Sequence, residues 1–97
     1  MRKAPKVKDK RTFREWCHFM CLNTHHAAKL FGMSRPNIYK YLDESSPVEV
    51  REPVILACNL ISEQPAEKRL ETFKEALGPI LSQHPWPAQD PIEKTAP

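Results

Sequence analysis

Glycine is scarce in this sequence: only two glycines occur among 97 residues, and the ten prolines are concentrated outside the segments with helical periodicity. There is no glycine-rich loop to cradle a phosphate, and the motifs G-x-S-x-G and H-E-x-x-H are absent as well. The histidines cluster without a carboxylate pair or a nucleophile at an informative spacing. We therefore expect a non-catalytic protein with an all-α fold of about five helices in one domain.

Long apolar runs are also missing. No stretch is long enough to cross a bilayer, and no apolar segment follows the basic N-terminus as it would in a signal peptide. The three cysteines, an odd number, argue against a disulfide framework. These absences predict a cytoplasmic protein, associated with the nucleoid if it binds DNA.

Acidic residues are nearly missing from the first part of the chain. Residues 1–42 carry ten Lys or Arg and two Asp or Glu, whereas residues 43–97 carry five and ten. The overall charge of +3 therefore combines a basic half of charge +8 with an acidic half of charge −5. A basic half suits a polyanionic partner such as DNA, and an acidic half does not.

The stretch of residues 24–42, THHAAKLFGMSRPNIYKYL, has the pattern of two short helices joined by a tight turn. Thr24 is placed to cap the first helix and Ser34 the second, because each hydroxyl can accept a hydrogen bond from an unpaired backbone N–H. Gly32 lies at the turn, where a positive φ costs little, and Pro36 falls in the first turn of the second helix. The side chains of the second helix that are expected to face inward are Ile38, Tyr41 and Leu42.

Residue types at fixed positions in this stretch form a motif. Ala28 is a small residue, Gly32 follows it by four positions, and the β-branched Ile38 follows Gly32 by six. Phe31 and Met33 flank the turn. The pattern resembles the helix-turn-helix of small bacterial, phage and plasmid repressors. This resemblance covers residues 24–42 and implies sequence-specific binding of double-stranded DNA.

The resemblance also implies which side chains reach the bases. In that family, residues just before and after the anchoring isoleucine contact base edges, and here these positions hold Ser34, Arg35, Pro36, Asn37, Tyr39 and Lys40. Arg35 suits a guanine through O6 and N7, and Asn37 suits an adenine. Tyr39 is expected to contact either a thymine methyl or a phosphate. Pro36 stands where the family more often has a polar residue, so direct readout is expected to be thinner.

Phosphate contacts are expected from the first helix of this pair and from the N-terminal segment. Thr24, His25 and Lys29 lie where the N–H groups and side chains of that helix favour phosphate. Residues 1–11 hold six basic residues and little to bury, so we expect a flexible arm. This arm either contacts phosphates and the minor groove or is a solvated tail that raises the encounter rate. Its candidate phosphate-binding residues are Arg2, Lys3, Lys6, Lys8, Lys10 and Arg11.

The segment from Thr12 to Leu22 is predicted to be the first helix of the chain, with Thr12 and Glu15 as a capping box. Its apolar residues recur at helical spacing and should close a three-helix core: Phe13, Trp16, Cys17, Met20 and Cys21. Two cysteines and three histidines also have spacings that could hold zinc: Cys17, Cys21, His18, His25 and His26. Free cysteines on an apolar stripe behave as small hydrophobes, and no C-x2-C pair is present, so we predict no metal and no cofactor.

The start of the acidic half permits more than one interpretation. Within residues 43–53, Ser46 and Glu49 suggest a capping box, but Pro53 would kink a helix that began there. Residues 48–51 also alternate like a short strand. We favour a loop, followed by a helix that begins near Pro53.

Residues 46–81 are predicted to be a helical dimerisation region. Residues 54–61 are too apolar all round for a surface helix, so more than one face should be covered. A further helix, opened by Pro65 and ended by Gly78 and Pro79, carries an apolar stripe made of Ala66, Leu70, Phe73 and Leu77. We expect a homodimer because a single helix-turn-helix makes few contacts with DNA, and the expected interface is Val54, Ile55, Leu56, Leu60 and Ile61.

Residues 82–97 contain four prolines and few apolar groups, and we expect a flexible tail. Trp86 is the exception, and it is expected to dock on the body of the protein or on a partner. The predicted organisation is thus a basic arm at 1–11, a helix-turn-helix unit at 12–45, a dimerisation region at 46–81 and a Pro-rich tail at 82–97.

Three functional hypotheses follow. The first is a dimeric transcriptional repressor that binds an inverted-repeat operator in double-stranded DNA. The second is an antitoxin-like or accessory factor that binds DNA and also binds a protein through its acidic C-terminal half. The third is a helical interaction module that does not bind DNA.

Overall fold

The computed structural model describes residues 3–94. Its helices are α1 (Lys10–Phe19), α2 (Thr24–Phe31), α3 (Arg35–Leu42), α4 (Glu52–Glu63) and α5 (Ala66–Leu77), and a 3-10 turn, η1 (Gly78–Ile80), follows α5. No β-strand occurs within residues 3–94, so the predicted all-α class is confirmed. No helix in this part of the chain has both the length and the apolar character needed to cross a membrane.

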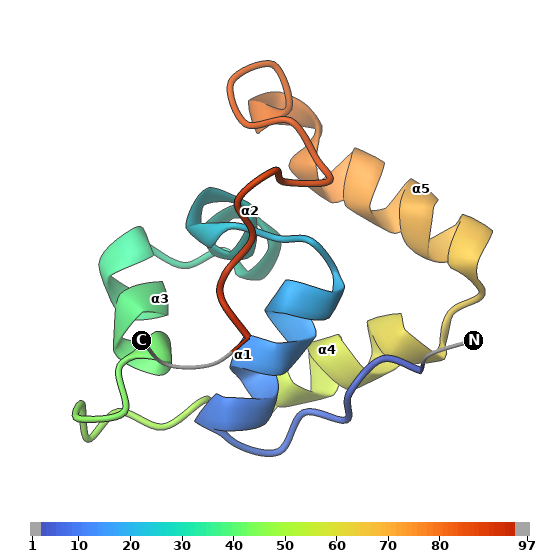
Figure 1. The fold of residues 1–97 in the computed structure, drawn as a ribbon. Coiled ribbons are helices and arrows are strands. Elements are labelled where there is room, and N and C mark those ends of the chain that lie inside the picture. Colours follow the sequence, from blue (N-terminus) through green and yellow to red (C-terminus); the bar gives the residue numbers. More distant parts are fainter. Residues whose placement is uncertain (1–2, 95–97) are drawn as a thin grey trace.

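The first helix, α1, lies in the middle of the view, and α2 packs against both α3 and α5 (Figure 1). Phe13, Trp16 and Cys17 are fully buried, as their spacing predicted. The ring of Phe13 meets Tyr41 of α3 edge-on at 5.6 Å between centroids, and Trp16 meets Phe73 of α5 edge-on at 6.5 Å. Edge-to-face pairs of this kind are favourable, so two aromatic residues of α1 join both halves of the chain in one core.

The first helix begins earlier than predicted because Asp9, not Thr12, is its N-cap. The Asp9 carboxylate accepts a hydrogen bond from the Thr12 N–H at 2.9 Å, and the Thr12 hydroxyl accepts one from the Asp9 N–H at 2.9 Å. Hydrogen bonds from Thr12 also hold the pKa of Asp9 below its ordinary value. The predicted box between Thr12 and Glu15 is wrong, and the helix ends at Phe19 rather than at Leu22.

The cap of α2 is Asn23, one residue before the predicted cap Thr24. The Asn23 side-chain oxygen accepts a hydrogen bond from the His26 N–H at 2.9 Å, and the Asn23 N–H donates to Nδ1 of the His26 ring at 3.2 Å. Asn is at least as good an N-cap as Thr, so the earlier residue takes the role. This correction leaves the Thr24 hydroxyl available to other partners.

The turn between α2 and α3 follows the prediction. Gly32 ends α2 with a φ of +64°, a conformation that residues with a side chain rarely adopt. The Ser34 side chain accepts a hydrogen bond from the Asn37 N–H at 3.4 Å, and Pro36 lies in the first turn of α3. Of the side chains predicted to face inward, two are fully buried and the third is half-buried: Ile38, Tyr41 and Leu42 respectively.

The N-terminal segment, residues 3–9, is anchored to α4 rather than forming the predicted flexible arm. Val7 is only 1% exposed, and its N–H and C=O are hydrogen-bonded to the Asn59 side chain at 2.9 and 3.0 Å. One buried valine and its hydrogen bonds to the Asn59 side-chain amide thus fix the position of a segment whose composition is otherwise basic. Lys10 and Arg11, predicted to belong to the arm, are part of α1, and Arg2 lies outside the described residues.

The loop after α3 also agrees with the prediction. Residues 43–51 contain no helix or strand, and α4 begins at Glu52 with Pro53 in its first turn. The loop is held to α3 by the Arg51 N–H, which donates to the Tyr41 hydroxyl at 3.3 Å. Pro53 therefore starts a helix, a position where its missing N–H is harmless.

The fourth helix has one buried face and one exposed face. Val54 and Ile61, which were predicted to contact a second subunit, are buried in the core of the chain itself, and that part of the prediction is wrong. Leu56 and Leu60 are 60% and 55% exposed, and Ile55 is partly buried. Residues four apart lie on the same side of a helix, so Leu56 and Leu60 form one exposed apolar strip.

The fifth helix buries only the second half of its predicted stripe. Phe73 and Leu77 are buried, whereas Ala66 and Leu70 are exposed. Its first turn extends beyond the core, and the helix ends before Gly78 as predicted.

The C-terminal segment packs back across the end of α1 instead of forming the predicted flexible tail (Figure 1). The chain turns sharply at Cys21, which has a φ of 57°, and the neighbouring carbonyls become available to other donors. Three donors from the segment use them: Trp86 Nε1–H to Met20 O at 2.8 Å, Ala88 N–H to Cys21 O at 2.9 Å and Ile92 N–H to Leu22 O at 2.9 Å. Trp86 thus docks on the body of the protein, one of the two outcomes expected for it.

Substitution by alanine is expected to affect the free energy of unfolding differently at the two glycines. Gly32→Ala forces a side chain into the left-handed region and should lower the free energy of unfolding by about 1–2 kcal/mol. Gly78→Ala is the matched control, because its φ of −42° is helical and a Cβ there would meet no atom within 4 Å. We expect Gly78→Ala to be neutral or to stabilise by about 0.4–1 kcal/mol. Urea unfolding of both variants measures the difference, and equal stabilities would contradict the role given to Gly32.

Candidate nucleic-acid interface

The outer face of α3 carries all six residues predicted to contact bases. Ser34, Arg35, Pro36, Asn37, Tyr39 and Lys40 are each exposed. They face solvent because Ile38 and Tyr41 turn the opposite side of the short helix into the core. The arrangement leaves a polar and basic helix surface on which side chains are free to reach a partner.

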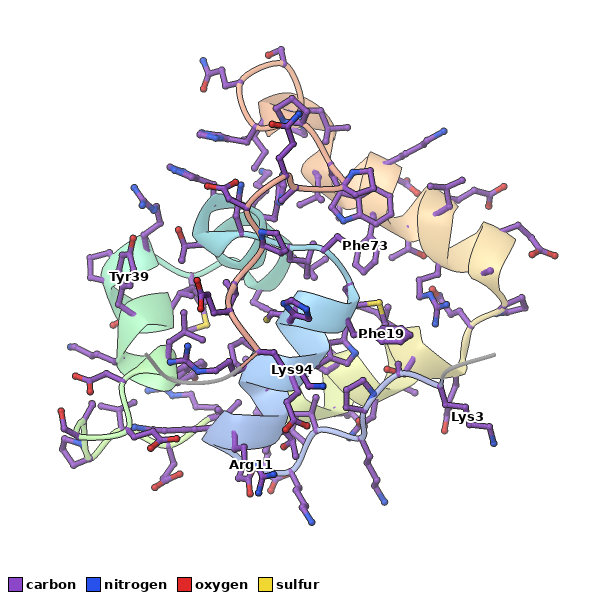
Figure 2. All side chains as sticks on the ribbon, in the orientation of Figure 1. Lys3, Arg11, Phe19, Tyr39, Phe73 and Lys94 are labelled. Carbon is purple, nitrogen blue, oxygen red and sulfur yellow. The ribbon has the colours of Figure 1, made fainter. Side chains whose placement is uncertain are left out.

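Three of the predicted residues meet at one end of this face. The Nε–H of Arg35 donates to Oγ1 of Thr24 at 3.3 Å, and Nη2 of Arg35 donates to the Tyr39 hydroxyl at 2.8 Å. The guanidinium carbon lies 5.6 Å from the centre of the Tyr39 ring. The Tyr39 side chain projects from α3 at one side of the molecule, and a hydrogen bond from Thr24 is the main reason why the pKa of its phenol lies below the ordinary value (Figure 2).

His25 lies beside this cluster and against the C-terminal segment. Its ring stacks on the ring of His84 with centroids 3.6 Å apart and an interplanar angle of 13°. Loss of hydration on burial, followed by the charge of Arg35, lowers the pKa of His25, and Asp90 opposes this effect. These effects favour the neutral form of His25, which can donate a hydrogen bond but supplies no positive charge.

His26, which the sequence singled out only as a possible metal ligand, holds the segment in place. Its side chain is fully buried, with Nδ1 accepting the Asn23 N–H and Nε2 lying 2.7 Å from the His84 carbonyl oxygen. An acceptor at Nδ1 places the proton on Nε2, which then donates to that carbonyl. One ring thus links the cap of α2 to the C-terminal segment.

A hollow of about 450 Å³ lies beside Arg35 and Tyr39. Its wall includes Thr24 and His25 from α2 and a residue that sequence reasoning missed, Arg14 of α1. Arg14 donates to the carbonyl oxygens of Leu42 and Glu93, the latter at 3.5 Å. The signal that could have found it is weak: Arg14 lies on the polar side of α1, as several other charged residues do.

The C-terminal segment contributes acidic side chains to the same hollow. Asp90 and Glu93 line it together with the basic residues. Ile92 between them is buried and held to α1 by His18 Nδ1, which lies 3.1 Å from its carbonyl oxygen. No local pattern in the sequence predicted that residues near position 90 would border α2 and α3. The candidate interface therefore has an acidic rim as well as a basic face.

The remaining predicted phosphate contacts are not gathered at this cluster. Lys29 is exposed on α2, but the Lys10 ammonium group is tied to the carbonyl oxygens of Asp43 and Ser46 at 2.9 and 2.6 Å. Arg11 pairs with Glu15 at 3.4 Å. Lys3 and Tyr39 appear at opposite sides of the molecule in Figure 2. Lys3 thus lies apart from the α3 cluster, and Lys6 and Lys8 are exposed on the N-terminal segment.

Of the two cysteines considered for zinc, Cys17 lies in the core and Cys21 at the turn after α1. Burial raises the pKa of the Cys17 thiol well above its ordinary value, and it raises that of Cys58 to about 12. Both cysteines are buried and protonated at neutral pH. Within residues 3–94 no three His, Cys, Asp or Glu side chains lie close enough together to hold a metal ion.

Comparisons with protein-family models, with curated proteins and with solved structures found no match for this chain.

The docking of the C-terminal segment can be tested at Trp86. Trp86→Ala removes both the indole hydrogen bond and the contact with Phe73, so the free energy of unfolding should fall by about 2 kcal/mol. The amides of Ala88 and Ile92, which donate to Cys21 and Leu22, should lose protection against hydrogen exchange. Trp86→Phe keeps a ring and should lose less of both. Full protection of these amides in Trp86→Ala would show that the indole does not anchor the segment.

Proposed function

We propose that this protein binds double-stranded DNA in a sequence-dependent manner and regulates transcription, with repression through an occupied operator as its simplest mode. The observation that carries the proposal is the outer face of α3, where every residue with a base-reading role in the helix-turn-helix interpretation is exposed. The turn at Gly32 supports it, because the φ of +64° is the conformation that this motif requires of its glycine. The concentration of positive charge in residues 1–42 supports it as well.

In this proposal α3 is the recognition helix and lies in the major groove. Arg35 reads a guanine, Asn37 reads an adenine and Lys40 contacts a base or the adjacent backbone. The N-terminus of α2 approaches a phosphate, where its free N–H groups and a neutral His25 donate hydrogen bonds and Lys29 supplies charge. Such a protein acts where the chromosome lies, in the cytoplasm of a bacterial cell.

A homodimer is part of the proposal, and the exposed strip of α4 is its interface. Leu56 and Leu60 are more than half exposed and lie four residues apart. A strip on one helix can pair with its own copy about a two-fold axis, as a symmetric interface requires. Ile55 borders the strip, whereas Val54 and Ile61 serve the core. Two recognition helices about 34 Å apart would then meet an inverted-repeat operator.

The same strip suits a second candidate function, in which α4 binds a different protein and the chain is an antitoxin-like or accessory DNA-binding factor. The observation behind it is again the exposure of Leu56 and Leu60, which any apolar partner could cover. The oligomeric state of the isolated protein separates the two candidates, since only the first requires a dimer.

Selection of duplexes from a random pool tests the main proposal, and Arg35→Ala tests its sharpest assignment. The variant should bind the selected duplex more weakly by about 1–3 kcal/mol and lose its preference at one base pair per half-site. Lys74→Ala on α5 is the control for loss of one exposed positive charge, and it should leave the base preference unchanged. An Arg35→Ala variant with the wild-type ratio of specific to random binding would remove Arg35 from the base readers.

The dimer is tested with Leu56→Asp. The wild-type chain should sediment as a dimer at tens of micromolar, and Leu56→Asp should sediment as a folded monomer because a carboxylate would be buried without a partner. Leu70→Asp on α5, which is 41% exposed, is the control and should remain dimeric. A wild-type monomer, or a dimer that tolerates Leu56→Asp, would contradict this interface.

A further inference from the structure

The contacts of Arg35 distinguish the two edges of its guanidinium group. A guanidinium offers donors in a rigid plane, and two of its edges can each present a pair of N–H groups. The side edge consists of Nε–H and the nearer N–H of Nη2, and the end edge consists of one N–H each from Nη1 and Nη2. The bond from Nε to Thr24 at 3.3 Å uses the side edge, and the bond from Nη2 to Tyr39 at 2.8 Å uses the nitrogen that this edge shares with the end edge, so Nη1 makes neither bond.

Two hydroxyl groups therefore act together as the acceptor for that edge. Thr24 comes from the first turn of α2 and Tyr39 from the middle of α3, and Arg35 begins α3 between them. Thr24 and Tyr39 each accept a hydrogen bond from Arg35, so the guanidinium group joins the two hydroxyls. The Tyr39 ring, with its centre 5.6 Å from the guanidinium carbon, restricts the side chain further.

We propose that Thr24 and Tyr39 are positioning residues that fix the side edge of Arg35 and leave its end edge free for the O6 and N7 atoms of a guanine. This inference rests on the proposed function, and it replaces the direct DNA contacts that the sequence suggested for Thr24 and Tyr39. Arg35 is exposed and would otherwise sample many rotamers. A side chain that is ordered before binding loses less entropy when it meets its target, so the hydroxyl pair increases both affinity and base discrimination.

The two hydroxyls also connect specificity to the fold. Thr24 lies next to Asn23, the cap of α2, and the correct spacing of α2 and α3 is needed for one oxygen from each helix to reach the same guanidinium edge. Each helix alone provides only half of the acceptor pair. The Arg35 conformation is thus set by the packing of the helix pair and not by α3 alone.

The experiment compares Tyr39→Phe and Thr24→Val with wild type. Tyr39→Phe keeps the ring but removes its oxygen, and Thr24→Val keeps the shape but removes the hydroxyl. On a duplex selected by the wild-type protein, each variant should lose discrimination at the base pair read by Arg35 by roughly three- to tenfold. Discrimination at other base pairs and the dependence of affinity on salt should not change, since no phosphate contact is lost.

Two further variants separate positioning from direct contact and from damage to the fold. Tyr39→Phe in an Arg35→Ala background should have no additional effect, because Tyr39 acts only through Arg35. Thr24→Ser retains the hydroxyl and should recover most of the wild-type discrimination. The proposal would be overturned if the effects of Tyr39→Phe and Arg35→Ala on discrimination were additive in the double variant. Equal losses of discrimination in Thr24→Ser and Thr24→Val would overturn it as well.

A measurement without DNA decides the proposal independently of the proposed function. The phenol of Tyr39 has a lowered pKa because hydrogen bonds from Thr24 and Arg35 stabilise its charged form, so Thr24→Val and Arg35→Gln should each raise that pKa in an ultraviolet titration. The difference between the wild-type curve and the Tyr39→Phe curve assigns the signal to this tyrosine rather than to Tyr41. An unchanged phenol pKa in both variants would overturn the hydroxyl pair, whereas failure to select any duplex would overturn only the proposed function.

Discussion

The end of α1 is the constraint on which the rest of the structure depends. The N–H groups of Met20, Cys21 and Leu22 bond to the last carbonyls of α1, and the turn at Cys21 leaves the carbonyl oxygens of these same three residues to accept bonds from elsewhere. A segment more than sixty residues later satisfies all three. The same turn brings Asn23 into position to cap α2, so one junction fixes both the start of the α2–α3 pair and the path of the C-terminal segment.

Local features of the fold could be predicted because their causes are local. The turn at Gly32 and the loop before Pro53 follow from the backbone preferences of single residues, and the stripe of α1 follows from helical periodicity. The errors at Thr12 and Thr24 arose where two residues within three positions of each other could each act as a cap. The sequence alone does not decide such a competition, since the choice depends on which side chain the next turn can also bond, as His26 does with Asn23.

Long-range contacts explain the larger errors. The N-terminal and C-terminal segments were expected to be flexible because their composition is polar and rich in proline or lysine. Val7 in the first segment and Ile92 in the second are buried, Trp86 in the second is partly buried, and hydrogen bonds to distant groups hold each segment as well. The average composition of a segment does not reveal a single residue that anchors it. An isolated valine or tryptophan in a polar segment is therefore a better indicator of docking than the segment's mean hydropathy.

The candidate site shows the same division between local and long-range information. That α3 would expose Arg35, Asn37 and Tyr39 follows from its period, and the spacing of four between Arg35 and Tyr39 allows them to meet. The bond from Arg35 to Thr24 depends on how α2 packs on α3, and the presence of Asp90 depends on the turn at Cys21.

The Arg35–Thr24 bond and the position of Asp90, both set by long-range packing, decide the electrostatic character of the exposed face of α3. Asp90, together with a neutral His25, weakens the attraction for any phosphate at the N-terminus of α2. An acidic rim lowers the affinity for every DNA sequence alike, whereas a fixed arginine improves only the correct one. For a DNA-binding protein the ratio of specific to non-specific binding matters more than the affinity itself, because non-specific sites vastly outnumber the operator. Under the proposed function, a face that combines an ordered Arg35 with an acidic border favours discrimination between sequences over strong general attraction to DNA.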